Sequence, residues 1–243
     1  MIWKIPFVKG ACGRSSRGEA ADNNSDNNAV DKTDDAAKQE YQRFIEHVRF
    51  LCTSFPITDE EALNTLIVYR DMVAREVISS LNARIVNPER YDVIGVGPGD
   101  FFPLCYIDHS GKEVDLPEEG SIEIDLTKVP CISPPWQPWR INRQYTRETD
   151  FQYDPYNHKG YWYKHIGIAC IDNGLHSQYD GACYRDKAVV PLRVIDDSPL
   201  YEQMDTNGCE WIFTGGKTVR LSDIRLAKLF WLQREIMRMT RDR

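Results

Sequence analysis

The stretch from residue 162 to 196 constrains the fold most, because it predicts a strand, a turn, a short helix and a second strand in direct succession. Apolar, branched runs of strand length flank a glycine turn and a short segment of helical character. In order, these elements are a strand over His165–Ile171, a turn at Asp172–Gly174, a helix over His176–Tyr184 and a strand over Val189–Ile195. The succession predicts a sheet with a helix packed on it.

The turn in this stretch predicts a site for an anion. A helix that begins directly after a glycine turn presents free backbone N–H groups and the positive end of the helix dipole. We expect Asn173, Gly174, His176 and Ser177 to form the seat, with Asp172 shaping the turn. The candidate counter-charges are Arg140, Arg143 and Arg185. The pattern favours a nucleotide or another phosphate ligand.

Catalysis is a separate question that the sequence leaves open. If the site hydrolyses its ligand, His176 with Asp180 or Asp172 is the acid–base set that lies close in sequence. A capping or core histidine explains His176 equally well. The sequence therefore gives His176 and Asp180 as candidate catalytic residues without assigning a reaction.

Two helices are predicted ahead of this stretch. Apolar residues recur at helical spacing over 36–55, and a second helix follows the capping-box pair Thr58 and Glu61 and extends to Ile85. The short connection between the helices predicts an antiparallel pair. The core positions expected on the second helix include Leu63, Leu66, Ile67, Val77 and Ile78.

Two hairpins and one alternating strand complete the predicted sheet elements. The strands are expected over 104–108 and 114–116, over 121–129, and over 211–213 and 218–221. The aromatic and arginine-containing segment 142–161 is interpreted as a loop that packs over a sheet edge, with a grip on a base as the alternative.

The last predicted helix, from Ser222 to about Met239, lies in a basic region. Between Lys217 and Arg243 there are eight basic residues against three acidic ones. A solvated helix face explains this excess, and contact with an acidic partner or nucleic acid is the alternative. The second hypothesis for function is therefore a non-catalytic interaction or adaptor protein that uses its aromatic loop and basic C-terminal helix.

Composition excludes several classes of protein. The 243 residues carry a net charge of −7, which argues against a general nucleic-acid binder. No window reaches the length of a transmembrane helix and the first ten residues lack the flanks of a secretory signal, so we expect a cytoplasmic protein without membrane contact. The seven cysteines and five histidines are dispersed, which predicts reduced thiols and no metal site.

Two segments, taken in order, resemble the ParB and sulfiredoxin superfamily. The strand Ile122–Val129 with the Pro-rich turn 135–140 is similar to a strand and Gln-Pro-Arg turn of that group, and Gly174 and His176 fall on the Gly and His of the sulfiredoxin motif Gly-Cys-His-Arg. The resemblance implies that a nucleotide phosphate sits at this turn. Leu175 stands at the position of the catalytic cysteine and Ser177 at that of the arginine, so reductase chemistry is not implied.

The whole chain also resembles a bacterial family with the hallmark Asn-Gly-x-His-Ser, which implies no activity. We predict an α+β protein, with an N-terminal helical hairpin packed on a mixed sheet that contains the ParB/sulfiredoxin-like core, and a C-terminal helix. The expected division is an apolar patch and disordered linker over 1–35 and one domain over 36–243. Its parts are the helical hairpin 36–86, a loop and small hairpin 87–120, the core 121–197, and a hairpin with the last helix 198–243.

Overall fold

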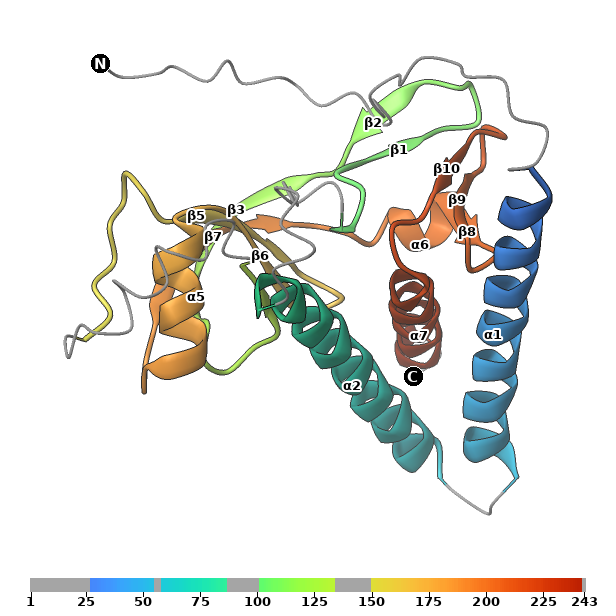
Figure 1. Ribbon diagram of the computed structural model, residues 1–243, viewed down its shortest axis with the longest axis horizontal. Helices are drawn as coiled ribbons and strands as arrows, with labels where there is room; N and C mark the ends of the chain where they lie inside the picture. The colour runs from blue at the N-terminus through green and yellow to red at the C-terminus, as the bar shows by residue number, and fades with distance from the viewer. Residues whose placement is uncertain (1–26, 55–57, 87–100, 134–149, 242–243) are drawn as a thin grey trace.

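The computed structural model describes residues 27–54, 58–86, 101–133 and 150–241. In this part of the chain a five-stranded mixed sheet lies beside long helices, with a two-stranded and a three-stranded antiparallel sheet next to it (Figure 1). The helices are α1 (Asn27–Thr53), α2 (Asp59–Val86), α5 (Leu175–Tyr184), α6 (Leu200–Gln203) and α7 (Ile224–Arg241). The strands are β1 (Cys105–Ile107), β2 (Glu113–Asp115), β3 (Glu118–Asp125), β4 (Cys131–Ile132), β5 (Lys159–Tyr163), β6 (Ile168–Asn173), β7 (Val189–Ile195), β8 (Met204–Thr206), β9 (Glu210–Phe213) and β10 (Thr218–Arg220). The architecture is α+β, which confirms the predicted fold class.

The large sheet has the strand order β3-β7-β5-β6-β4. Its middle strand, β5, pairs parallel with β7 and antiparallel with β6. The outer pairs are β3 with β7, which is antiparallel, and β4 with β6, which is parallel. Because the β5–β6 hairpin forms the centre of this sheet, its two ends position both the polar network and the candidate site described below.

Strand β6 is buried on both of its faces. Ile168 and Cys170 point into the larger core, which also contains apolar residues of α1, α2 and α7. Ala169 and Ile171 alternate with them and enter a smaller core, where Leu175 and Ala182 of α5 pack. The continuous apolar run in the sequence therefore reflects a central strand covered on both sides.

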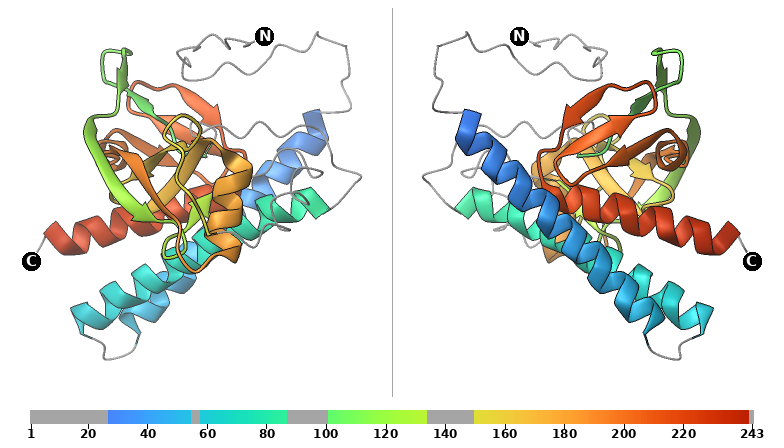
Figure 2. Two further views of the ribbon diagram at one scale, coloured as in Figure 1. Left: turned by 90° about the vertical axis from the view of Figure 1, so that its left-hand side faces the viewer. Right: turned by 90° about the vertical axis from the view of Figure 1, so that its right-hand side faces the viewer.

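The long helices form through local signals and a shared apolar core. At the start of α2, the Thr58 backbone N–H donates to Glu61 Oε2 at 2.7 Å, and the Glu61 N–H donates to Thr58 Oγ1 at 3.2 Å, so the predicted capping box is confirmed. Helix α2 packs along α7, and α1 packs on both of them (Figure 2). The side chains of Leu66 and Val77 are buried between these helices. The N-terminal helices therefore share their core with the C-terminal helix as well as with each other.

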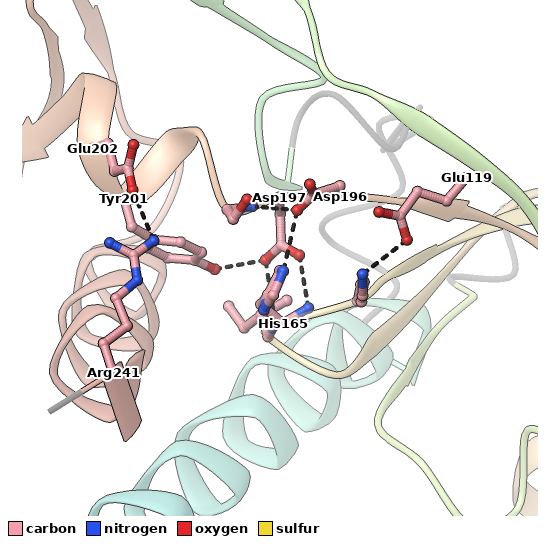
Figure 3. A network of polar contacts seen from close by, with 10 residues as sticks. Glu119, His165, Asp196, Asp197, Tyr201, Glu202 and Arg241 are labelled. Carbon is pink, nitrogen blue, oxygen red and sulfur yellow. Dashed lines mark hydrogen bonds and ion pairs between the residues drawn. The ribbon is translucent and has the colours of Figure 1, made fainter. Parts of the chain in front are cut away.

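A buried carboxylate joins the sheet to the helices (Figure 3). Asp197, directly after β7, has no solvent exposure. Its Oδ1 accepts the His165 backbone N–H at 2.7 Å, and its Oδ2 accepts the Ile166 N–H at 3.2 Å and the Tyr201 hydroxyl at 2.7 Å. Burial raises the pKa of the Asp197 carboxyl group, and the hydrogen bonds from His165 and Tyr201 offset part of that rise. The ring of Tyr201 stacks on Phe230 of α7 at 5.1 Å, so this carboxylate ties the β5–β6 turn to the helical side.

Several boundaries differ from the sequence prediction. Helix α1 begins at Asn27, so residues 27–35 are helical rather than part of a linker. Residues His165–Gly167 form the turn before β6 rather than the start of a strand, because Asp197 binds their backbone. Strand β5 occupies residues that were assigned to the aromatic loop, and strand β8 was not predicted. The predicted strands of the two hairpins, the helix before β7 and β7 itself are confirmed.

The substitution Leu66→Ala tests the interface between α2 and the core. Leu66 is 4% exposed, so removing its methyl groups should lower the free energy of unfolding by about 2 to 5 kcal/mol. The matched control on the same helix is Met72→Ala, since Met72 is 60% exposed and should cost less than about 0.5 kcal/mol. Chemical denaturation measures both values, and equal effects would contradict the described packing of α2.

The buried carboxylate gives a second stability test. Asp197→Ala leaves two backbone N–H groups and the Tyr201 hydroxyl without their acceptor, so we expect a loss of at least about 3 kcal/mol. Tyr201→Phe removes only one of the three donors and should cost about 1 kcal/mol. Urea denaturation measures the loss of unfolding free energy in both variants. A smaller loss for Asp197→Ala than for Tyr201→Phe would show that this network does not join the sheet to the helices.

Candidate functional site

The turn between β6 and α5 is built on a left-handed glycine. Gly174 links the two elements with φ 76° and ψ 26°, in the left-handed region that favours glycine. A Cβ atom here would lie 2.7 Å from His158 Cδ2 and 2.9 Å from the Asn157 carbonyl oxygen. The close approach at this glycine is therefore made by the protein's own loop before β5.

The imidazole of His158 contacts the first turn of α5. Its Nδ1 accepts the backbone N–H of Asp154 at 3.0 Å, so in the neutral ring Nε2 carries the proton. Nε2 lies 2.7 Å from Ser177 Oγ, and that hydroxyl donates to the Gly174 carbonyl oxygen at 3.1 Å. Burial lowers the pKa of His158, which favours the neutral form. Since a serine nucleophile needs a histidine nitrogen that accepts its proton, this contact has the wrong polarity for activating Ser177.

The first turn of α5 keeps backbone donors available. The first intrahelical bond runs from the Gln178 N–H to the Gly174 carbonyl, and the N–H groups of Leu175 and Ser177 have no acceptor among the described residues. Lys159 faces Asn173 in the β5–β6 register, and its exposed side chain has no ion-pair partner in the described part of the chain. The turn therefore combines a helix N-terminus with a neighbouring cation.

Aromatic side chains stand on the loop that covers the turn. Phe151 stacks on the imidazole of His158 at 5.2 Å and 20°. Tyr153 is 40% exposed and Tyr156 is 88% exposed. Exposed aromatic rings beside an anion seat provide surfaces on which a base can stack.

The candidate catalytic pair lies inside the protein. His176 and Asp180 are 8% and 6% exposed on the buried side of α5. The Oδ2 atom of Asp180 accepts the Nε–H and an Nη–H of Arg185, both at 2.8 Å, while its Oδ1 atom has no partner among the described residues. An acid–base function of this pair stays a prediction, and its burial beside an arginine does not favour it.

The predicted counter-charges do not gather at the turn. Arg185 follows the last turn of α5 and binds Asp180, which lies roughly 9 Å along the helix from Gly174. Arg140 and Arg143 lie outside the described residues. The cation that the structure places beside the turn is Lys159, which the sequence analysis missed together with His158. The only sequence signal for these two residues was their position just before the aromatic run of β5.

The basic C-terminal region uses its charges within the chain. Six of its eight basic residues form ion pairs with acidic residues of the same protein. The pairs are Arg220 with Asp34, Arg225 with Asp223 and Glu76, Lys228 with Glu40, Arg234 with Asp205, Arg238 with Glu235, and Arg241 with Glu202. The excess of basic residues in the sequence is therefore explained by contacts with α1, α2, α6 and β8, and it does not favour an acidic or nucleic-acid partner at α7.

The described ranges contain neither a metal-binding cluster nor a membrane-spanning helix. No group of three or more His, Cys, Asp or Glu side chains there is arranged to hold a metal ion. None of the helices described combines the length and the apolar surface that crossing a bilayer requires.

Two substitutions separate the stability cost of the close contact at Gly174 from the cost of its left-handed backbone conformation. Gly174→Ala places a methyl group against His158 and the Asn157 carbonyl, and we expect it to cost roughly 2 to 3 kcal/mol or more. The matched control is Gly216→Ala, since Gly216 has φ 81° with nothing within 4 Å, and it should cost about 1 kcal/mol for the conformation alone. Equal losses in denaturation would show that the loop does not press on the turn.

Comparison with known proteins gives a family without an assigned activity. No curated protein and no solved structure matches the chain. The resemblance to the ParB and sulfiredoxin superfamily is thus a prediction without a structural counterpart. Residues 23–242 match a family of unknown function, DUF6710, and the match covers α1 through α7. The chain belongs to the DUF6710 family.

Proposed function

We propose that this protein binds a phosphate-bearing ligand, a nucleotide in the first instance, at the N-terminus of α5. The observation that carries the proposal is a ten-residue helix that begins directly after a left-handed glycine and leaves the N–H groups of Leu175 and Ser177 without acceptors among the described residues. Such a helix end attracts anions through its free donors and its dipole.

A lysine and two exposed tyrosines near the turn also support the binding of a nucleotide there. Lys159 supplies a positive charge beside Asn173, and it can pair with a phosphate as a mobile point charge. The loop residues Tyr153 and Tyr156 offer exposed rings near the turn, which suits the base of a nucleotide. The superfamily resemblance, carried by Gly174 and His176, implies the same kind of ligand at the same turn.

The geometry changes the roles of the residues that were expected to bind. The backbone N–H groups of Leu175 and Ser177 become the phosphate contacts, whereas buried His176 supports the helix from inside. His158 holds the Ser177 hydroxyl from the opposite side, as a donor. We assign binding to this site and no chemical step.

Calorimetry and thermal-shift measurements with a panel of nucleoside mono-, di- and triphosphates, pyrophosphate and inorganic phosphate test the proposal. A ligand at a hundred times its Kd should stabilise the protein by about 2.7 kcal/mol. Lys159→Ala should weaken binding by about tenfold, because it removes a charged contact. Ser177→Ala keeps the backbone N–H and removes only the hydroxyl that joins His158 to the Gly174 carbonyl, so it should weaken binding less. Lys187→Ala, an exposed lysine beyond the other end of α5, is the matched control and should bind normally.

A further variant separates the phosphate from the base. Tyr156→Ala should weaken a nucleotide by roughly tenfold or more and leave pyrophosphate affinity unchanged, since only the nucleotide has a ring to stack. No stabilisation by any member of the panel, or the same loss in Lys187→Ala as in Lys159→Ala, would reject the site.

A further inference from the structure

A cleft of about 510 Å³ lies between α1, the end of β8 and α7, and none of its lining residues belongs to the turn at Gly174. Figure 1 shows α1 standing beside the strands β8 and β9, with α7 next to both. The floor contains Tyr41, Ile45 and Trp231, all of them buried. The exposed side chains of Lys38 and Arg49 line its rim. The volume is within the range of small-molecule sites, which is about 300 to 1,000 Å³.

Three basic side chains line the cleft, and one of them has an acidic partner among the described residues. Arg234 binds Asp205 at 2.9 Å and lies over the ring of Phe230. Arg49 has its guanidinium 5.6 Å from the centre of the Trp231 ring, and no carboxylate pairs with it in the described part of the chain. Lys38 likewise has no ion-pair partner among the described residues. This differs from the basic residues of α7, where each described arginine or lysine has an acidic partner.

Tyr41 supplies an independent observation that points to a ligand. Its side chain is 5% exposed, it lines the cleft, and its hydroxyl has no hydrogen-bond partner among the described residues. Burial raises the pKa of this hydroxyl; the nearby charge of Arg234 lowers it, the Asp205 carboxylate raises it and Arg49 lowers it. The hydroxyl oxygen is not among the fully buried polar atoms that lack a partner, so it reaches the cleft, where an anionic ligand can accept its hydrogen.

We propose that the cleft binds a small phosphorylated ligand of the sugar-phosphate class. Arg49 pairs with the phosphate, a group that carries about −1.5 to −2 charges at neutral pH, and Lys38, roughly 16 Å away along α1, adds attraction from the other end of the cleft. The Tyr41 hydroxyl donates to the same group. The amide side chains of Gln39 and Gln42 on the rim meet the sugar hydroxyl groups. This site is separate from the turn at Gly174 and does not depend on the function proposed for it.

Isothermal titration calorimetry with ribose 5-phosphate and glucose 6-phosphate tests the proposal, with ribose, glucose and inorganic phosphate as controls. The intact protein should bind a sugar phosphate and should not bind the free sugar. Arg49→Gln should weaken binding by about tenfold or more, the effect of losing a hydrogen bond to a charged group, and Lys38→Gln should weaken it severalfold. Tyr41→Phe keeps the ring against Gly208 and should weaken binding severalfold without changing the unfolding midpoint of the free protein.

Two sets of controls locate the ligand. Arg43→Gln removes an exposed arginine of α1 that does not line the cleft, and it should bind normally. Ser177→Ala and Lys159→Ala should also bind sugar phosphates normally, whatever they do to nucleotides.

Four outcomes would overturn the proposal. They are no binding of either sugar phosphate to the intact protein, unchanged affinity in Arg49→Gln and Lys38→Gln, an equal loss in Arg43→Gln, and a loss caused by Ser177→Ala or Lys159→Ala. An acidic peptide that binds in place of the sugar phosphates, and is lost in Arg49→Gln, would show a protein partner instead of a small ligand.

Discussion

The carboxylate of Asp197 is the constraint on which the packing of sheet and helices depends. It has no contact with solvent, and among the described residues its hydrogen-bond donors are the His165 and Ile166 backbone N–H groups and the Tyr201 hydroxyl. An apolar side chain at this position would leave those N–H groups unsatisfied inside the protein. The carboxylate therefore fixes where the β5–β6 turn lies relative to α6, and the stacking of Tyr201 on Phe230 extends that constraint to α7.

The same hairpin connects this network to the candidate site. One end of the β5–β6 hairpin is the turn bound by Asp197, and at its other end Lys159 faces Asn173, one residue before Gly174. A slip in the register of β5 would turn its buried side chains to the other face and move Lys159 away from the helix N-terminus. The position of the cation at the turn is thus a consequence of strand pairing that is set at the far end of the hairpin.

Local signals were sufficient to predict much of the fold. Thr58 and Glu61 gave the start of α2, and the apolar run of β7 gave its bounds, because capping and strand patterns depend on neighbours in the sequence. Gly174 was likewise expected at a turn that needs a glycine. The class of the fold followed from the order of these elements.

What could not be predicted depends on pairs distant in the sequence. Strand β5 looked like an aromatic loop because its strand character comes from pairing with β6 and β7 on its two sides. The contact between His158 and Ser177 spans nineteen residues and has no motif of its own. The buried side of α5 could not be known before the sheet was assembled, so the sequence left open whether His176, which is buried, contacts a ligand or belongs to the core.

The pairing of charged residues is the clearest case of a feature that depends on residues distant in the sequence. It also indicates where a ligand can bind. The basic residues near the C-terminus appeared to be an interaction surface, yet Arg220 pairs with Asp34 at a separation of 186 residues, and α7 finds its other acids on α1, α2, α6 and β8. Exposed pairs of this kind add little stability, but they remove the local excess of charge. A count of charges along the sequence therefore says little about partners until the pairs are known. Once they are known, cations that remain unpaired near hydrogen-bond donors carry more information: Lys159 stands next to a helix N-terminus, and Lys38 and Arg49 line the same cleft as the Tyr41 hydroxyl. Both arrangements leave positive charge and hydrogen-bond donors together at one place, which is the condition that an anionic ligand satisfies.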